Sequence, residues 1–98
     1  MANIKKKLDN EAHKKKVVFT SQGWEDYQYW RKTNPAKFDK INELIASAQQ
    51  SLHTGIGKPE KLSNNLKGYY SRRIDIEHRL VYKGDGNDLV IFTARFHY

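Results

Sequence analysis

The sequence contains no cysteine among its 98 residues. Disulfide bonds and thiolate metal sites are therefore excluded, which suits a reducing compartment. No apolar run approaches the ~20 residues of a membrane-spanning helix, and the lysine-rich beginning of the chain lacks the apolar core of a signal peptide. We therefore expect a cytoplasmic protein that is not associated with a membrane.

Several catalytic and nucleotide-binding motifs are absent as well. Residues 54–59 contain two glycines and a lysine, but they lack the GxxxxGK[ST] pattern and follow a predicted helix instead of a strand. There is no GxSxG nucleophile motif, and the four histidines lack a metal-ligand spacing such as HExxH. We expect neither a metal nor another cofactor. No helix carries the basic, base-reading face of a DNA-binding module.

Positive charge is what the sequence has in excess, with 18 lysines and arginines against 11 acidic residues and a net charge of +7. The length predicts one domain, and an aromatic content of 12% argues against disorder. A small basic domain typically binds a polyanion, with nucleic acid as the first candidate. A solubilising surface or an acidic protein partner would explain the same charge, so charge alone leaves all three open.

The chain divides into a basic extension, residues 1–16, and a domain, residues 17–98. The extension carries two lysine triplets and few apolar residues, which is typical of a mobile arm. It could add electrostatic affinity for RNA or have no role.

The first half of the domain predicts a strand over residues 17–19 and two helices. Residues 23–32 form the first helix, with an aromatic stripe that we assign to packing. Asn34 caps the second helix and Pro35 occupies its first turn. Apolar residues at helical spacing continue to Leu52, namely Phe38, Ile41, Leu44, Ile45, Ala48 and Leu52.

The second half predicts three antiparallel strands over residues 68–74, 78–83 and 88–97, with turns at 75–77 and 84–87. In the last strand we expect one wholly apolar face to pack against the helices, made of Val90, Phe92, Ala94 and Phe96. Arg95 and His97 would share the opposite face. The predicted fold is α+β, with two layers.

Arginine, histidine, carboxylate and tyrosine could together cut RNA without a metal. The RNA's own 2′-OH attacks the phosphate, which requires a base, cationic support and an acid for the departing 5′-oxygen. Arg73 and Arg79 lie on neighbouring predicted strands and would grip a phosphate with their guanidinium groups. His97 ends an apolar strand and could transfer protons. Salt-bridged surface strands would produce a similar pattern, so these residues alone do not decide the matter.

From residue 17 to 98, the chain resembles the YoeB-like (Txe/YoeB) toxins of the RelE superfamily. The matching segments, in order, are Trp24-Glu25-Asp26-Tyr27, Tyr29-Trp30, Lys40-Ile41-Asn42-Glu43-Leu44-Ile45, Gly57-Lys58-Pro59-Glu60, Asn65-Leu66, Gly68, Ser71-Arg72-Arg73-Ile74, Glu77-His78-Arg79-Leu80-Val81-Tyr82 and Arg95-Phe96-His97-Tyr98. Their order and spacing across the domain make the resemblance specific.

The resemblance implies a RelE-like fold and a ribosome-dependent endoribonuclease that cuts mRNA in the A site of the 70S ribosome and stops translation. It also implies a cognate acidic, YefM-like antitoxin and a homodimer. The alternative is a non-catalytic module that blocks translation by occupying the ribosome or RNA, because the basic surface alone would suffice for that.

The resemblance further implies roles for individual residues. Glu60 matches the general base, Arg79 the phosphate clamp, His97 the general acid, and Tyr98 the residue that orients the phosphate or stacks on a base. Further residues are expected to bind RNA phosphate, namely Arg73, Arg72, Lys61 and Arg95. Glu77 would support neighbouring basic groups or act only as an ion-pair partner.

Two positions depart from the family pattern. Ser63 stands where some relatives carry a lysine three residues after the glutamate, which removes a second cation unless Lys61 replaces it. Phe96 stands where tyrosine is common.

Overall fold

The computed structural model describes Ile4 and residues 14–96. The chain forms the strand β1 (Lys16–Phe19), the helices α2 (Ser21–Thr33) and α3 (Pro35–Gln50), the strand β2 (Glu60–Lys61), the short 3₁₀ helix η1 (Asn64–Leu66), and the strands β3 (Tyr70–Arg73), β4 (Arg79–Asp85) and β5 (Asp88–Thr93). Most of the predicted extension, together with His97 and Tyr98, lies outside the described residues.

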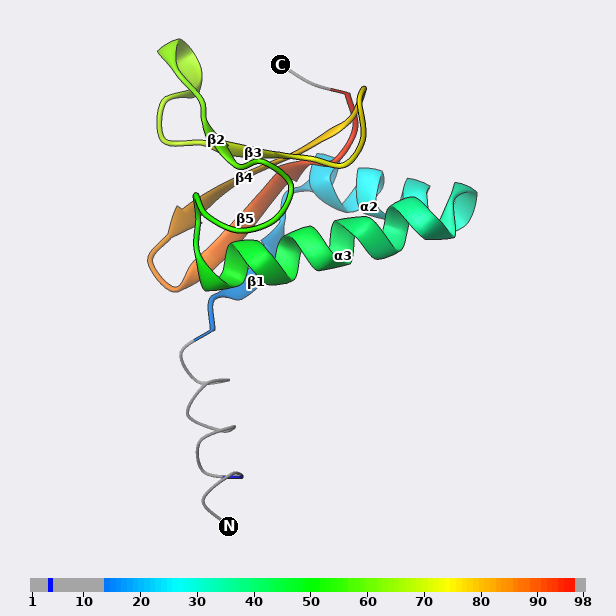
Figure 1. The fold of residues 1–98 in the computed structure, drawn as a ribbon, viewed down its shortest axis with the longest axis horizontal. Helices are drawn as coiled ribbons and strands as arrows, with labels where there is room; N and C mark the ends of the chain where they lie inside the picture. The colour runs from blue at the N-terminus through cyan, green and yellow to red at the C-terminus, as the bar shows by residue number, and fades with distance from the viewer. Residues whose placement is uncertain (1–3, 5–13, 97–98) are drawn as a thin grey trace.

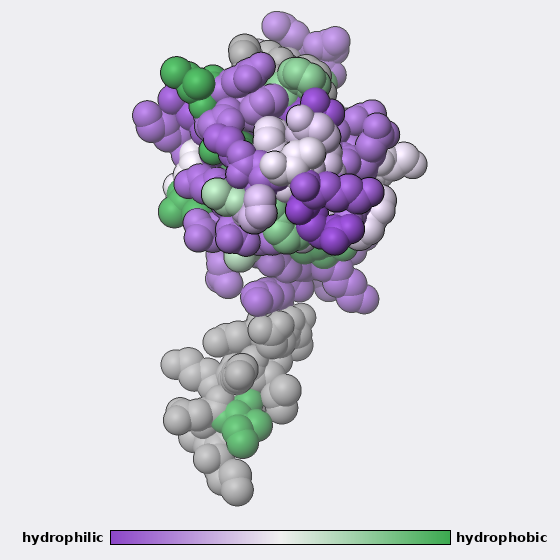
Figure 2. Space-filling view, turned by 90° about the vertical axis from the view of Figure 1, so that its right-hand side faces the viewer, coloured by the Kyte–Doolittle hydropathy of each residue, from purple (hydrophilic) through white to green (hydrophobic). Residues whose placement is uncertain are grey.

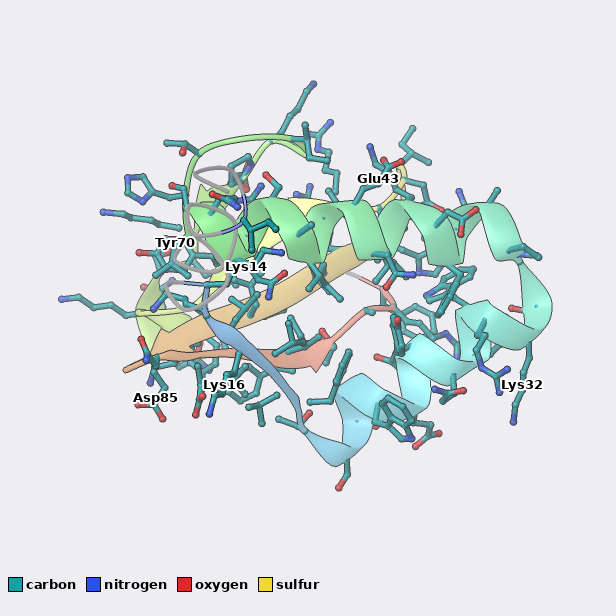
Figure 3. The ribbon with its side chains drawn as sticks, turned by 90° about the horizontal axis from the view of Figure 1, so that it is seen from below. Lys14, Lys16, Lys32, Glu43, Tyr70 and Asp85 are labelled. Atoms are coloured by element: carbon teal, nitrogen blue, oxygen red, sulfur yellow. The ribbon has the colours of Figure 1, made fainter. Side chains whose placement is uncertain are left out.

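One five-stranded sheet has the order β1-β5-β4-β3-β2. The edge strand β1 runs parallel to β5, whereas the other neighbours are antiparallel. Both helices pack on one face of this sheet (Figure 1), and α3 lies along it when seen from below (Figure 3). The predicted α+β fold of two layers is confirmed.

Local sequence signals account for both helices. The Thr20 hydroxyl accepts a hydrogen bond from the N–H of Gly23 (3.0 Å) and caps α2. Asn34 serves both helices, because its N–H donates to Trp30 O and its side chain accepts from the N–H of Lys37. Pro35 at the start of α3 has no N–H to leave unpaired.

The core lies between α3 and the central strands. Fully buried apolar side chains from α3 and from strands β4 and β5 meet there, namely Ile41, Leu44, Ala48, Leu80, Tyr82, Leu89 and Ile91. Trp30 joins them from α2, while Trp24 remains about half exposed against Phe19 and Tyr27. The hydrophobic spacing of α3 therefore predicted its buried face correctly.

The predicted face of the last strand is wrong. Leu89 and Ile91 enter the core, whereas Val90 and Phe92 are only partly buried, and β5 ends at Thr93 instead of residue 97. Both alternating sets of this strand are apolar, so alternation could not choose between them. An irregularity of pairing between Val81 and Tyr82 shifts the register locally.

Strand β2 was not predicted, because Glu60–Lys61 has no apolar alternation and becomes a strand only by pairing with β3. Among the described residues, no helix has the length and apolar character that crossing a membrane would need.

Candidate functional site

The sheet face opposite the helices brings Glu60 and Arg79 together. Glu60 on β2 pairs with Ser71 on β3, and Arg73 on β3 pairs with Arg79 on β4. Because cross-strand partners and alternate residues share a face, these four side chains belong to the same face. Oε2 of Glu60 lies 3.9 Å from Nη1 of Arg79. The structure thus joins two of the predicted site residues across an intervening strand.

Exposure and pairing differ between the two partners. The Glu60 side chain is 57% exposed, whereas that of Arg79 is 21% exposed. Among the described residues, Nη1 of Arg79 is buried without a hydrogen-bond partner, and so is the hydroxyl of Ser71. A long, partly exposed ion pair stabilises the fold little. The pair is therefore better suited to receive a ligand than to hold the sheet together.

Ser71 was missed as a site candidate. It is 2% exposed and lies on β3, between the strands of Glu60 and Arg79. The sequence carried a usable signal, because Ser71 and Arg73 stand two residues apart in a strand and must share a face.

Arg73 lies in a basic hollow of about 420 Å³. Lys40 of α3 and Lys58 of the loop before β2 line the same hollow. Three cations around one concave surface favour a phosphate or another anion. Lys40 and Lys58 were not predicted for the site, since the first comes from the helix and the second from a loop.

Arg72 must be removed from the predicted phosphate-binding set. Its side chain is 0% exposed and points to the helix side, where Nε donates to the Tyr82 hydroxyl (2.8 Å). Both terminal nitrogens donate to oxygens of α3 and the following loop. A guanidinium that is buried and fully engaged in this way cannot reach a phosphate. The two neighbouring arginines thus point to opposite faces, as the strand period requires.

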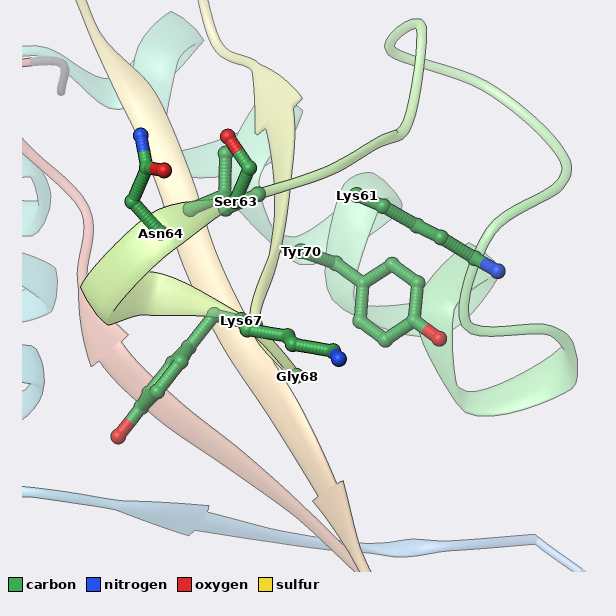
Figure 4. Close-up of a pocket in the computed structure, with 8 residues that line it drawn as sticks. Lys61, Ser63, Asn64, Lys67, Gly68 and Tyr70 are labelled. Carbon is green, nitrogen blue, oxygen red and sulfur yellow. The ribbon is translucent and has the colours of Figure 1, made fainter.

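Lys61 lies at a different pocket, of about 430 Å³, on the β2–β3 edge. The ring of Tyr70 lies there between the side chains of Lys61 and Lys67, and Ser63 lines the same pocket (Figure 4). Lys61 is exposed and remains available for RNA. It stands next to Glu60 in the strand and therefore points to the other face.

Arg95 stacks its guanidinium on the ring of Tyr29, 3.7 Å from the ring centroid. Among the described residues, no contact joins Arg95 to the Glu60–Arg79 pair. Its predicted role in phosphate binding therefore has no geometric support from this pair.

The end of the described chain is tied down beside Arg79. The N–H of Arg79 donates to Phe96 O (2.8 Å), and the N–H of Phe96 donates to Nδ1 of His78 (2.7 Å). His78 also packs edge-on against Trp30 and lies 3.4 Å from the exposed Glu77 carboxylate. His78 is thus occupied in structure. Glu77 contacts this histidine and no arginine of the site among the described residues.

The surface around these residues is mainly hydrophilic, with apolar side chains exposed only in small separate places (Figure 2). Among residues 14–96 and Ile4, no cluster of histidines and carboxylates could hold a metal ion. What the described site offers is one carboxylate, two arginines, two lysines and a hydroxyl on one rigid sheet.

Comparisons with known proteins agree with the motifs. A family model described as "YoeB-like toxin of bacterial type II toxin-antitoxin system" matches residues 19–98. The "Toxin YoeB" of Streptomyces coelicolor is 49% identical over 85% of this chain and 99% of the relative. The "Toxin YoeB" of Escherichia coli K12 is 45% identical over the same shares.

Solved structures agree as well. A YoeB/ParE toxin from Agrobacterium tumefaciens superimposes with a TM-score of 0.81 at 45% identity, covering 85% of this chain and 99% of that one. A YoeB dimer from Staphylococcus aureus gives a TM-score of 0.81 at 46% identity over 87% and 99%. YafQ from Escherichia coli, at 16% identity and a TM-score of 0.67, shares the fold.

Proposed function

This chain belongs to the YoeB-like toxins of bacterial type II toxin–antitoxin systems, and we propose that it is a ribosome-dependent endoribonuclease that cuts mRNA in the ribosomal A site. The observation that carries the proposal is the approach of Glu60 to Arg79, at 3.9 Å, on the helix-free face of the sheet. Such a toxin acts where ribosomes are, in the cytoplasm.

The reaction needs no metal, because RNA supplies its own nucleophile. Glu60 accepts the proton of the 2′-OH, whose oxygen attacks the adjacent phosphorus. The P–O5′ bond breaks, and the departing oxygen takes a proton from His97. The products are a 2′,3′-cyclic phosphate and a free 5′-OH.

Arg79 stabilises the extra negative charge on the phosphorane-like transition state. Its Nη1, which has no hydrogen-bond partner among the described residues, is a donor held in place before substrate arrives. Arg73, Lys40 and Lys58 add positive potential along the RNA backbone. Tyr98 orients the phosphate or stacks on a base.

The test uses ribosomes programmed with a defined mRNA, in the presence of a chelator. We expect cuts at the A-site codon, mapped by primer extension. An mRNA with a 2′-deoxy sugar at the cut position should stay intact, and the double variant His97→Ala, Tyr98→Ala should lose cleavage. Cleavage of the deoxy substrate, or undiminished cutting by the double variant, contradicts the mechanism.

A second function, occupation of the ribosome without cleavage, is favoured by the exposed lysines Lys58, Lys61 and Lys67. It predicts inhibited translation with intact mRNA and little effect of Glu60→Ala. Salt dependence does not separate the two functions, because both rest on phosphate contacts.

Two partners accompany the proposal. Toxins from Staphylococcus aureus at 48–49% identity form YoeB–YefM complexes, and a YoeB dimer is known from the same organism. We expect this chain to bind an acidic YefM-like antitoxin and to form a homodimer. Light scattering with and without the antitoxin tests both.

A further inference from the structure

The side chain of Arg72 is buried completely, yet it pairs with no carboxylate among the described residues. It donates five hydrogen bonds instead, all to neutral oxygens. A buried charge is unfavourable unless hydrogen bonds replace its hydration. A fold that keeps a buried cation with neutral partners gains something from those particular bonds.

Three of the five acceptors are carbonyls of the loop between α3 and β2. Nη2 donates to Ser51 O (2.6 Å) and Thr54 O (2.8 Å), and Nη1 donates to Ile56 O (2.9 Å). The loop spans residues 51–59 and has no helix or strand of its own. Arg72 therefore supplies the partners that secondary structure would otherwise give these carbonyls.

Two side chains complete the arrangement. The Ser47 hydroxyl on α3 accepts from Nη1 of Arg72 (2.7 Å) and from the N–H of Ile56 (3.3 Å). The Tyr82 hydroxyl on β4 accepts from Nε and donates to Leu52 O (2.5 Å). Burial raises the pKa of Tyr82, against the opposing effect of Arg72, so its hydroxyl keeps the proton that it donates.

The same strand also receives the end of the loop. The N–H of Arg73 donates to Gly57 O (2.7 Å), and Glu60 pairs with Ser71. Gly57 has a φ of +84°, and a Cβ there would lie 3.2 Å from Cβ of Arg72 and 2.5 Å from Leu44 Cδ2. The loop is thus pressed onto Arg72 where only glycine fits.

Strand β2 depends on this attachment, because it has only two residues and pairs only with β3. We infer that Arg72 is a positioning residue: its buried guanidinium clamps the loop of residues 51–57 to the sheet and thereby holds Glu60 opposite Arg79. The consequence for Glu60 rests on the proposed function, whereas the clamp itself does not.

The first test measures the clamp by amide hydrogen exchange. Arg72→Lys keeps the charge but cannot fork to several carbonyls. We expect the amides of residues 52–61 to exchange at least about tenfold faster than in the wild type, while amides of α3 and β5 change less. Ile41→Val is the matched control, because it weakens the core away from the loop. Equal acceleration in both variants, or an unchanged loop, overturns the clamp.

Two milder variants keep the test decisive should Arg72→Lys fold poorly. Ser47→Ala removes one acceptor of Arg72, and Tyr82→Phe removes another together with the bond to Leu52. Each should speed loop exchange by a smaller factor than Arg72→Lys. Loop exchange that is unchanged in both overturns the proposal.

The second test asks whether the clamp acts through Glu60. In single-turnover cleavage on ribosomes, Arg72→Lys should lower the maximal rate about tenfold to a hundredfold with little change in half-saturating concentration. On a Glu60→Gln background the same change should add little further loss. Independent, multiplying losses in the double variant overturn the link to Glu60. If the wild type cuts no mRNA, the proposed function fails, and the exchange experiment still decides on the clamp.

Discussion

Glu60 and Arg79 approach to 3.9 Å although their strands do not pair, because β3 lies between β2 and β4. Each is held by a different part of the chain. Glu60 follows the clamped loop, while Arg79 is fixed through its N–H to Phe96 O. The pair is therefore a sensitive reporter of how well the loop, the sheet and the chain end fit together.

The first prediction concerns the guanidinium of Arg79. Arg79→Lys keeps the positive charge but replaces a planar fork by a single ammonium group. We expect the cleavage rate on programmed ribosomes to fall by about 10²–10³, as for loss of one preorganised transition-state donor. Lys32→Ala, at an exposed position in the last turn of α2, should leave the rate unchanged. A wild-type rate for Arg79→Lys contradicts the assigned role.

The second prediction concerns Asp26, which is buried and holds the end of β5. Its Oδ2 accepts from the N–H of Ala94 (2.9 Å), while Nε1 of Trp30 donates to Ala94 O (2.7 Å). Asp26→Ala leaves a buried N–H unpaired and should lower the free energy of unfolding by about 1–3 kcal/mol. Urea denaturation measures this, with the exposed Glu25→Ala as the control. Equal midpoints for the two variants would show that the bond contributes nothing.

The third prediction reverses an ordinary rule at Gly23. Replacing glycine by alanine inside a helix usually stabilises by about 1 kcal/mol. Here a Cβ would lie 2.3 Å from Ile91 O, a backbone atom of the neighbouring strand that cannot turn aside. Gly23→Ala should therefore destabilise, by about 1–3 kcal/mol or more. Thermal unfolding decides the sign, and a raised melting temperature refutes the close packing of α2 on β5.

Sequence reasoning succeeded where a local signal decides the structure. Asn34 and Pro35 marked the junction of the two helices, and the spacing of apolar residues gave the buried face of α3. It failed for β5, where both alternating sets are apolar, and for β2, whose strand exists only through β3.

The same distinction explains the site. Glu60 and Arg79 were matched through the family motifs, and the structure brings them together. The sequence gave no reason to separate Arg72 from Arg73, because the acceptors that bury Arg72 come from a loop some twenty residues earlier. The assigned roles of His97 and Tyr98 remain predictions, since both lie outside the described residues.

The last prediction concerns Asp75 in the turn between β3 and β4. Partial burial opposes ionisation of its carboxylate, but a hydrogen bond from Lys37 and others from the N–H groups of His78 and Glu77 outweigh that effect and lower its pKa below the usual 3.8. Because the folded-state pKa is the lower one, the carboxylate stabilises the fold above pH about 4. This stability is lost as the pH falls through the folded-state pKa.

Asp75→Asn should accordingly be less stable than the wild type at neutral pH, by about 0.2–1 kcal/mol for a partly exposed ion pair. The difference should shrink below pH about 4 and vanish once the wild-type carboxyl is protonated. Urea denaturation across pH 2–7 measures both variants. Lys37→Ala is the informative control, because without the Lys37 bond the pKa of Asp75 should rise and the pH dependence should weaken. A stability difference that stays constant down to pH 2 contradicts the role of this carboxylate in fixing the turn before Arg79.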